Sequence, residues 1–278
     1  MSNPNAYLQN LHARLEELRT GDRAYQLASD AIVETLPYVH ANAVETENQR
    51  LLDVGCGLGF LSVRLAEREN AEVVGIDPSA EAIELARKEH AHVTNVRYYT
   101  AAAEEFPEMM KRLGEEPFDR AVLNMVLHSL DDKACLDALS GVHRALVPYG
   151  GVTLVVPDEL WTMRKLIQHA QRQGMERDEG MAWVRDMLGE KSVEIDIAIH
   201  GHEPWPEPIT IYNRSVQDYG SLLNAANFGF EIAFETETDG VATRTTKEVD
   251  YWEFKDYLSG FELSIHDRHI LVSAACPK

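Results

Sequence analysis

The segment LLDVGCGLGF, Leu51 to Phe60, places three glycines within five positions directly after an apolar run. Gly55, Gly57 and Gly59 would lie between a buried strand and a helix. A turn without side chains lets a ligand reach backbone N–H groups and a helix N-terminus at van der Waals distance. The pattern predicts a site for a flat or extended cofactor, and a purely structural turn is the alternative.

An acidic residue follows the glycines at a spacing that suits a ribose. Asp77 lies 18 positions after Gly59, at the end of the run VVGID, and its carboxylate could accept hydrogen bonds from both ribose hydroxyls. Turn formation by Asp before Pro78 is the alternative. The glycines read G-x-G-x-G, and Phe60 stands where a dinucleotide fingerprint has its third glycine, which disfavours a dehydrogenase.

Alternating strands and helices would position these groups. The apolar runs predict strands at 50–55, 71–77, 96–101, 118–126 and 151–158, with helices at 60–69, 79–90, 104–113 and 132–146 between them. Ser79 is expected to cap the second of these helices. Because each crossover helix must cover the sheet it leaves, we expect an α/β, doubly wound parallel sheet.

The remaining chain divides around this core. We expect N-terminal helices in residues 1–46, a cofactor-binding core in 47–158, an insertion in 159–213 and completion of the core sheet in 214–278. The insertion contains two helical runs, 160–175 and 178–191, and then an extended stretch, and it could form a lid over the carboxyl edge. The last part predicts a helix at 215–228, strands at 229–237 and 268–276, and a polar excursion between the strands.

Composition narrows the class of protein. The chain has 278 residues, 45% of them hydrophobic, and its formal net charge of −20 makes nucleic acid an unlikely partner. No apolar run approaches the about 20 residues that cross a bilayer, and the N-terminus has no basic start followed by an apolar block, so we expect a soluble, cytoplasmic protein that does not bind a membrane. Cys56, Cys135 and Cys276 are too few and too far apart for a disulfide framework or a metal pair, and we expect them to be reduced. The oligomeric state stays open, with a homodimer as one possibility.

Five motifs in order resemble the class I S-adenosylmethionine-dependent methyltransferases: LLDVGCGLG, VVGIDPS, AAAEEFP, FDRAVLNMVLHSL and HRALVPYGG. The resemblance spans Arg50 to Asp158. It implies a Rossmann-like, mostly parallel seven-stranded sheet with one antiparallel strand, formed by a hairpin of the last two strands. It also implies S-adenosylmethionine lying across the carboxyl edge.

The resemblance also implies roles for individual residues. The methionine part of the cofactor would be surrounded by Asp53, Gly55, Cys56 and Gly57, and its ribose would be bound by Asp77 with Pro78. The adenine would lie beside Ala103 and Glu104, and the sulfonium and the acceptor would lie beside Asn124 and Met125. Ala102 stands where relatives often have an Asp that binds the adenine amino group, so adenine recognition differs. Tyr149 replaces the first glycine of a Pro-Gly-Gly turn, which Gly150 and Gly151 could still form.

Methyl transfer depends mainly on the alignment of the acceptor atom with the methyl group, but a hydroxyl or ammonium acceptor also needs a base that takes its proton. His128, after the fourth strand, is the candidate, with packing as its alternative role. Nothing in the sequence matches the magnesium site of catechol-type methyltransferases, and His200 with His202 reads as an ordinary polar loop, so we expect no metal.

Aromatic residues could line the acceptor pocket. Candidates are Trp161, Trp183 and Tyr212 in the insertion and Tyr25 near the N-terminus, while the alternative for the insertion's aromatic residues is its own core. The sequence thus favours a methyltransferase for an aromatic or apolar small molecule. A non-methylating S-adenosylmethionine-binding protein and a protein or RNA methyltransferase are the alternatives.

Overall fold

The computed structural model describes residues 49–69, 71–157, 159–196, 208–231, 234–238, 241–245 and 269–275. The predicted N-terminal helices, Tyr25, His200, His202 and Cys276 lie outside these residues.

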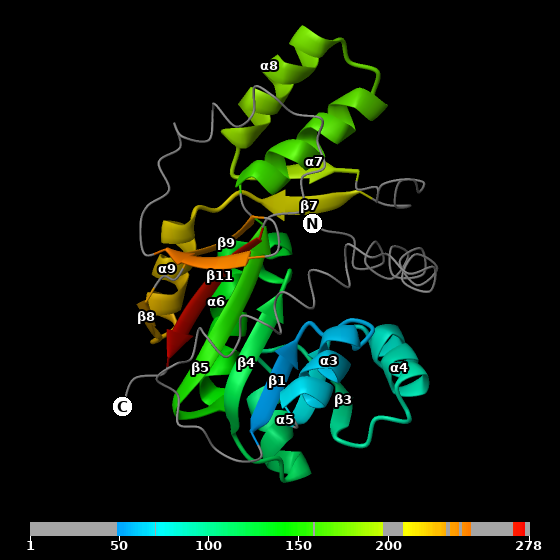
Figure 1. The fold of residues 1–278 in the computed structure, drawn as a ribbon, viewed down its shortest axis with the longest axis vertical. Helices are drawn as coiled ribbons and strands as arrows, with labels where there is room; N and C mark the ends of the chain where they lie inside the picture. The colour runs from blue at the N-terminus through cyan, green and yellow to red at the C-terminus, as the bar shows by residue number, and fades with distance from the viewer. Residues whose placement is uncertain are drawn as a thin grey trace.

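A seven-stranded sheet forms the centre of the structure, in the order β3-β2-β1-β4-β5-β11-β8 (Figure 1). The strands are β1 (Arg50–Val54), β2 (Glu72–Asp77), β3 (Val96–Thr100), β4 (Phe118–Asn124), β5 (Leu146–Pro157), β8 (Gly229–Glu231) and β11 (His269–Ala275). Strands β1 to β5 pair in parallel, whereas β11 runs antiparallel to both β5 and β8. The predicted doubly wound, mostly parallel sheet is confirmed.

Helices cover both faces of the sheet: α3 (Phe60–Glu69), α4 (Ala80–Glu89), α5 (Phe106–Leu113), α6 (Asp132–Ala145) and α9 (Val216–Ala225). Side chains alternate along each strand, so Leu51 packs with α3 on one face while Leu52 packs with α5, α6 and α9 on the other. Ser79 caps α4 as predicted, by accepting a hydrogen bond from the Ala82 amide at 3.1 Å.

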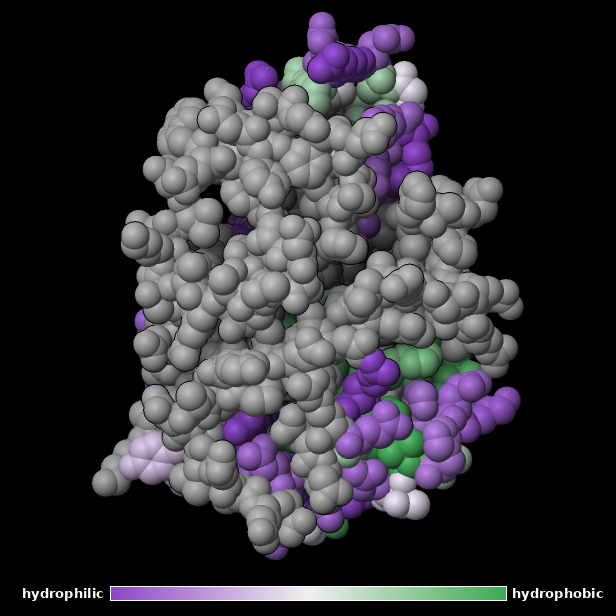
Figure 2. Space-filling model, viewed as in Figure 1, coloured by the Kyte–Doolittle hydropathy of each residue, from purple (hydrophilic) through white to green (hydrophobic). Residues whose placement is uncertain are grey.

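The outer surfaces of the helices are polar. On α4, for example, Glu84, Arg87, Lys88 and Glu89 are exposed. In the lower right of Figure 2, where α3 and α4 lie in Figure 1, hydrophilic residues surround smaller apolar areas. These helices are therefore amphipathic and bury their apolar sides against the sheet.

The chain between β5 and α9 contains α7 (Glu159–Arg172), α8 (Arg177–Leu188), β6 (Ser192–Ile195) and β7 (Ile209–Tyr212). Strands β6 and β7 form a separate antiparallel pair. Leu166, Val184, Val193, Ile195 and Ile211 form an apolar core of their own. Since α7 follows the end of β5 directly, this insertion lies at the carboxyl edge of the sheet, at the top of Figure 1.

One predicted strand is wrong in its extent. The sequence predicted one strand at 229–237, but the structure has β8 there and a second strand, β9 (Phe234–Thr238). β9 pairs with β10 (Val241–Thr245), which lies in the predicted polar excursion, and Thr238 faces Val241. The residues between them, Asp239 and Gly240, are an Asp-Gly pair typical of tight hairpins, a signal that the sequence analysis did not use.

Tyr149 takes up the backbone conformation that a glycine would adopt more easily. Its φ is 67° and its side chain is 59% exposed. Burial of the side chain therefore does little to offset the cost of the left-handed backbone. We expect Tyr149→Gly to raise the free energy of unfolding by about 0.5–1 kcal/mol, since relief of the left-handed strain outweighs the entropy that glycine loses on folding.

Urea denaturation would measure this change. Tyr149→Ala is the matched control, because alanine loses the same ring but keeps the strain. A Tyr149→Gly protein no more stable than Tyr149→Ala would contradict the explanation.

Candidate functional site

The predicted site residues come together at the carboxyl ends of adjacent strands. Asp53 lies in β1 beside Gly75 of β2 and Val122 of β4, Asp77 ends β2 and Asn124 ends β4. Parallel strands place these ends at one edge of the sheet, where open α/β sheets bind ligands.

The glycine turn follows β1 in a left-handed conformation at all three glycines. The φ angles are 70° at Gly55, 52° at Gly57 and 79° at Gly59. A Cβ on Gly55 would lie 2.4 Å from Val126 Cγ2, and one on Gly59 would lie 2.4 Å from the Tyr98 hydroxyl. Gly55 and Gly59 are therefore needed for both the backbone angle and the close packing, so the turn has a structural role, while Gly55 and Gly57 are only half-buried.

Asp77 holds this turn against the end of β2. Its Oδ2 accepts a hydrogen bond from the Gly57 amide at 3.0 Å, and its Oδ1 accepts one from the Ser79 amide at 2.9 Å. The side chain is buried. The sequence predicted where Asp77 lies but not its bond to the glycine turn. Pro78, directly after it, is exposed.

Asp53 is a second buried acid at the same edge. Only 1% of its surface is exposed, and the Ser62 hydroxyl donates a hydrogen bond of 2.6 Å to its Oδ2. Burial raises the pKa of Asp53 to about 7, the Ser62 bond opposes that rise, and the negative charge of Asp77 adds to it. Asp53 can therefore exchange a proton near neutral pH. Burial also raises the pKa of the neighbouring Cys56 thiol.

The side chains of Tyr98 and His90 contact carbonyl groups of the glycine turn, and neither residue was predicted from the sequence. The Tyr98 hydroxyl donates to the Gly59 carbonyl at 3.2 Å, and His90 Nε2 lies 3.0 Å from the Leu58 carbonyl. Gly75 of β2 makes room for the Tyr98 ring, because a Cβ there would lie 2.7 Å from Tyr98 Cδ1. These contacts join segments that lie far apart in the sequence.

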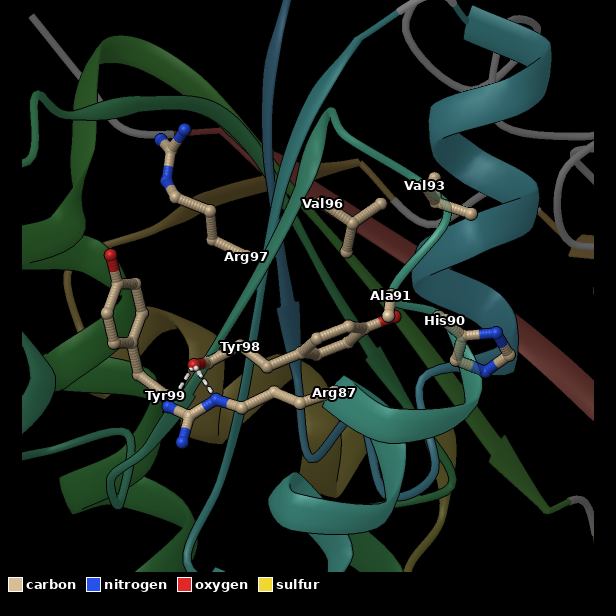
Figure 3. Close-up of a pocket in the computed structure, with 8 residues that line it drawn as sticks. All are labelled: Arg87, His90, Ala91, Val93, Val96, Arg97, Tyr98 and Tyr99. Carbon is tan, nitrogen blue, oxygen red and sulfur yellow. Dashed lines mark hydrogen bonds between the residues drawn. The ribbon is translucent and has the colours of Figure 1, made fainter.

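A cavity of about 340 Å³ opens on the outer side of β3 and α4. Figure 3 shows Tyr98 and His90 among its lining residues, with Arg87 bonded to the Tyr98 carbonyl at 3.1 and 2.5 Å. Its lining contains none of the predicted cofactor residues, so it is separate from the carboxyl-edge site.

The loop after β3 carries the residues predicted to flank adenine. Ala103 is half-buried and Glu104 is exposed. Helix α6 fixes this loop, since Gly141 lies so close that a Cβ on it would be 2.2 Å from the Ala103 carbonyl oxygen. Arg144 adds a hydrogen bond to the Glu104 carbonyl at 3.0 Å.

The end of β4 connects the edge to the insertion. Asn124 is half-buried, and Met125 has a φ of 56°, with its amide donating to the Val155 carbonyl at 2.8 Å. The Met125 side chain packs against the insertion's apolar core. His128 follows in a short 3-10 helix, η1 (Leu127–Ser129), and is buried.

Two of the candidate acceptor residues, Trp183 and Tyr212, have defined surroundings in the structure. Trp183 is half-buried in the insertion's core, where its ring stacks on His169 at 5.3 Å between centroids. Tyr212 is half-buried, with the Arg214 guanidinium 5.2 Å from its ring centroid. Trp161 lies in α7, and Tyr25 falls outside the described residues. Trp183 thus has a packing role, which was the alternative left open for the insertion's aromatic residues.

The described residues contain neither a membrane-spanning helix nor a cluster of metal-ligating side chains. None of the helices in the described part of the chain is both long and apolar enough to cross a membrane. Across the same residues, no three His, Cys, Asp or Glu side chains are grouped to hold a metal ion.

Comparison with known sequences identifies the family. The sequence model of a methyltransferase domain family matches residues 45–223, which is more than half of the chain. The chain belongs to the class I S-adenosylmethionine-dependent methyltransferase family. The five motifs that suggested this resemblance lie within the matched region.

Individual relatives agree with this family. An uncharacterized methyltransferase of Synechocystis sp. is 34% identical over 41% of this chain and 50% of its own length. A ubiquinone biosynthesis O-methyltransferase of Actinobacillus pleuropneumoniae is 34% identical over 35% of this chain and 42% of its own. The chain thus spans about half the length of these curated methyltransferase relatives.

A solved structure shares the methyltransferase fold. The 1,6-didemethyltoxoflavin-N1-methyltransferase of Burkholderia thailandensis, solved with 1,6-didemethyltoxoflavin and S-adenosylhomocysteine, matches with a TM-score of 0.54 and 14% identity. The match covers 100% of this chain and 92% of the other.

The raised pKa of Asp53 predicts a pH-dependent stability. The Asp53 carboxyl stays protonated up to about pH 7 in the folded state, whereas it loses its proton near pH 3.8 in the unfolded state. The protonated carboxyl therefore stabilises the folded state fully below about pH 3.8, and this contribution is lost as the pH rises through 7. Asparagine resembles the protonated form. We expect the stability of Asp53→Asn relative to the wild type to grow by about 2–3 kcal/mol between about pH 5 and pH 8.

Thermal unfolding of the ligand-free protein at both pH values would measure this difference. Asp186→Asn, at an exposed position on α8, is the control and should show no such trend. A constant difference between Asp53→Asn and the wild type would rule out a titrating Asp53.

Proposed function

We propose that this protein transfers a methyl group from S-adenosylmethionine to a small-molecule acceptor. The observation that carries the proposal is the glycine turn bonded to a buried acid at the carboxyl edge of a methyltransferase sheet. Family membership supports the reaction class, and the site supports the cofactor.

The residues at the edge fit the chemistry of this cofactor. Bound S-adenosylmethionine would supply an electrophilic methyl group on a sulfonium. A carboxylate accepts about four hydrogen bonds, which suits Asp77 for a ribose diol. Asp53, buried beside the turn, adds negative potential that favours the ammonium and sulfonium charges. Bare main chain at Gly55 and Gly57, with Cys56 between them, would lie against the methionine part.

The other cofactor residues would hold the adenine and align the methyl group. We assign Ala103 and Glu104 to the adenine, because α6 fixes their loop at the same edge as Asp77. We assign Asn124 and Met125 to the space below the sulfonium and the acceptor. The left-handed Met125 supports this role, since strained backbone is commonly kept at functional sites.

His128 is our candidate for the base. It lies three residues after Met125, in the turn that follows β4. Its imidazole would take the proton from a hydroxyl acceptor as the new bond to carbon forms, or from an ammonium acceptor before its nitrogen attacks. The surrounding edge would supply alignment and exclusion of water, which in-line displacement needs most.

We assign the acceptor site to the space beside the insertion. The insertion lies at the carboxyl edge and has its own apolar core, against which Met125 packs, and both features support a role as a lid. One similar protein is named for ubiquinone biosynthesis and another binds 1,6-didemethyltoxoflavin, and both names support an aromatic or apolar acceptor. Tyr212, Trp161 and Tyr25 are our candidates for contacting it.

The net charge of −20 supports a small-molecule acceptor over a nucleic acid. We further propose a cytoplasmic enzyme that works without a metal ion.

Removal of Asp77 tests the cofactor site. We expect Asp77→Ala to weaken S-adenosylmethionine binding by about 1–3 kcal/mol, because both the ribose acceptor and the anchor of the Gly57 amide are lost. Isothermal calorimetry measures this affinity. Asp119→Ala is the matched control, since Asp119 also accepts a backbone amide, that of Arg50 at 2.8 Å, but in the first part of β4. Equal affinities for the two variants would reject Asp77 as a ligand.

Methyl transfer itself is tested with labelled S-adenosylmethionine and a panel of aromatic and apolar metabolites. Transfer to a panel member supports the proposal, and cofactor binding with no transfer to any of them counts against it. With the accepted substrate, we expect His128→Asn to lower kcat about 100-fold or more at unchanged cofactor affinity. His92→Asn, at an exposed position, controls for loss of a histidine. Full activity in His128→Asn would leave catalysis to alignment alone.

A further inference from the structure

Arg214 lies where the chain returns from the insertion to the core, between β7 and α9. Its side chain is only 4% exposed. Nη1 donates to the Leu127 carbonyl at 2.9 Å, and Nη2 donates to the Leu130 carbonyl at 2.7 Å. Nε and Nη2 also donate to Asp132 Oδ1, at 3.1 and 2.9 Å. One guanidinium thus contacts both flanks of the η1 turn and the start of α6.

These contacts need an arginine. The planar guanidinium presents five N–H donors in a fixed fork, so it can reach two carbonyls and a carboxylate together. An ammonium group is a single point with no such fork. The Tyr212 and Tyr219 rings lie 5.2 and 6.0 Å from the guanidinium carbon and add cation–π attraction.

The turn that Arg214 holds is weakly held by its own backbone. Its backbone hydrogen bonds, from Ser129 to Val126 and from Leu130 to Leu127, measure 3.2 and 3.3 Å, and both are longer than the usual length of about 2.9–3.0 Å. The Ser129 hydroxyl also donates to the Val126 carbonyl, at 2.8 Å. The Cys135 thiol, 3.3 Å from the Leu127 carbonyl, is only a weak donor. Arg214 therefore provides charged donors to the Leu127 and Leu130 carbonyls, which hold the two ends of the turn together.

Asp132 connects the same network to the insertion at a second point. Its Oδ2 accepts a hydrogen bond from Lys191, before β6, at 2.5 Å. The bonds from Lys191 and Arg214 lower the pKa of Asp132, so it stays ionised at neutral pH. Lys191 is 74% exposed and its described bond does not reach the turn. It therefore offers a natural comparison for Arg214.

We propose that Arg214 is a positioning residue that fixes the orientation of His128 by clamping both flanks of the η1 turn. His128 lies within the clamped segment, so the orientation of its side chain depends on the loop between β7 and α9. The inference rests on the proposed function for the catalytic use of His128, but the clamp itself can be tested without any substrate.

The first test compares Arg214→Lys with the wild type. We expect amide hydrogen exchange in the peptide that covers residues 126–131 to become about tenfold faster, because lysine cannot bind both carbonyls. We also expect the ε1 proton resonance of His128, assigned by its loss in His128→Asn, to shift. Lys191→Met, which removes the other described partner of Asp132, should leave the exchange rate and the resonance as in the wild type.

Wild-type exchange and an unshifted resonance in Arg214→Lys would overturn the proposal. The lysine variant keeps a positive charge near Asp132, so we expect it to fold, and calorimetric affinity for S-adenosylhomocysteine should stay within about twofold because Arg214 lies outside the glycine turn. Failure of the wild type to bind S-adenosylhomocysteine would count against the proposed function alone, since exchange and resonance do not depend on that ligand.

Turnover provides the second test. With the acceptor found for the wild type, we expect Arg214→Lys to lower kcat about tenfold while the KM for S-adenosylmethionine is unchanged. An unchanged kcat in Arg214→Lys, under conditions where His128→Asn lowers it, would overturn a positioning role.

Discussion

The site depends on the hydrogen bond from the Gly57 amide to Asp77. This bond ties a turn that is left-handed at three glycines to the end of a buried strand. Without it, the turn would keep its conformational freedom and a ligand would have to supply the ordering energy on binding. Tyr98 and His90 hold the next two carbonyls of the turn from the other side. The main chain of the turn is thus held by hydrogen bonds from the protein itself.

The same arrangement brings two buried acids close together. Asp77 receives two backbone amides, whereas Asp53 receives the Ser62 hydroxyl and has a pKa raised to about 7. A site that keeps two carboxyl groups out of water is costly when both are ionised. It becomes favourable when a cation enters, which fits a sulfonium cofactor better than a polyphosphate. The electrostatics and the geometry therefore support the same class of ligand.

The sequence was most informative where local pattern determines structure. Strands β1 to β5 were predicted because buried parallel strands form continuous apolar runs, and Asp77 was placed by its distance from the glycines. The β9–β10 hairpin was missed although Asp239 and Gly240 mark it. Tyr98 and Arg214 could not be found in this way, because they contact carbonyls 39 and 84 or more residues away. Such contacts depend on tertiary packing, which a single sequence does not display.

The insertion has an apolar core of its own and shares Met125 with the edge of the main sheet. If the insertion contacts the acceptor, as proposed, substitutions inside that core can reshape the acceptor site without disturbing the strands that support the glycine turn. Relatives could therefore diverge in substrate choice by exchanging this one segment, while the donor half of the enzyme is inherited unchanged.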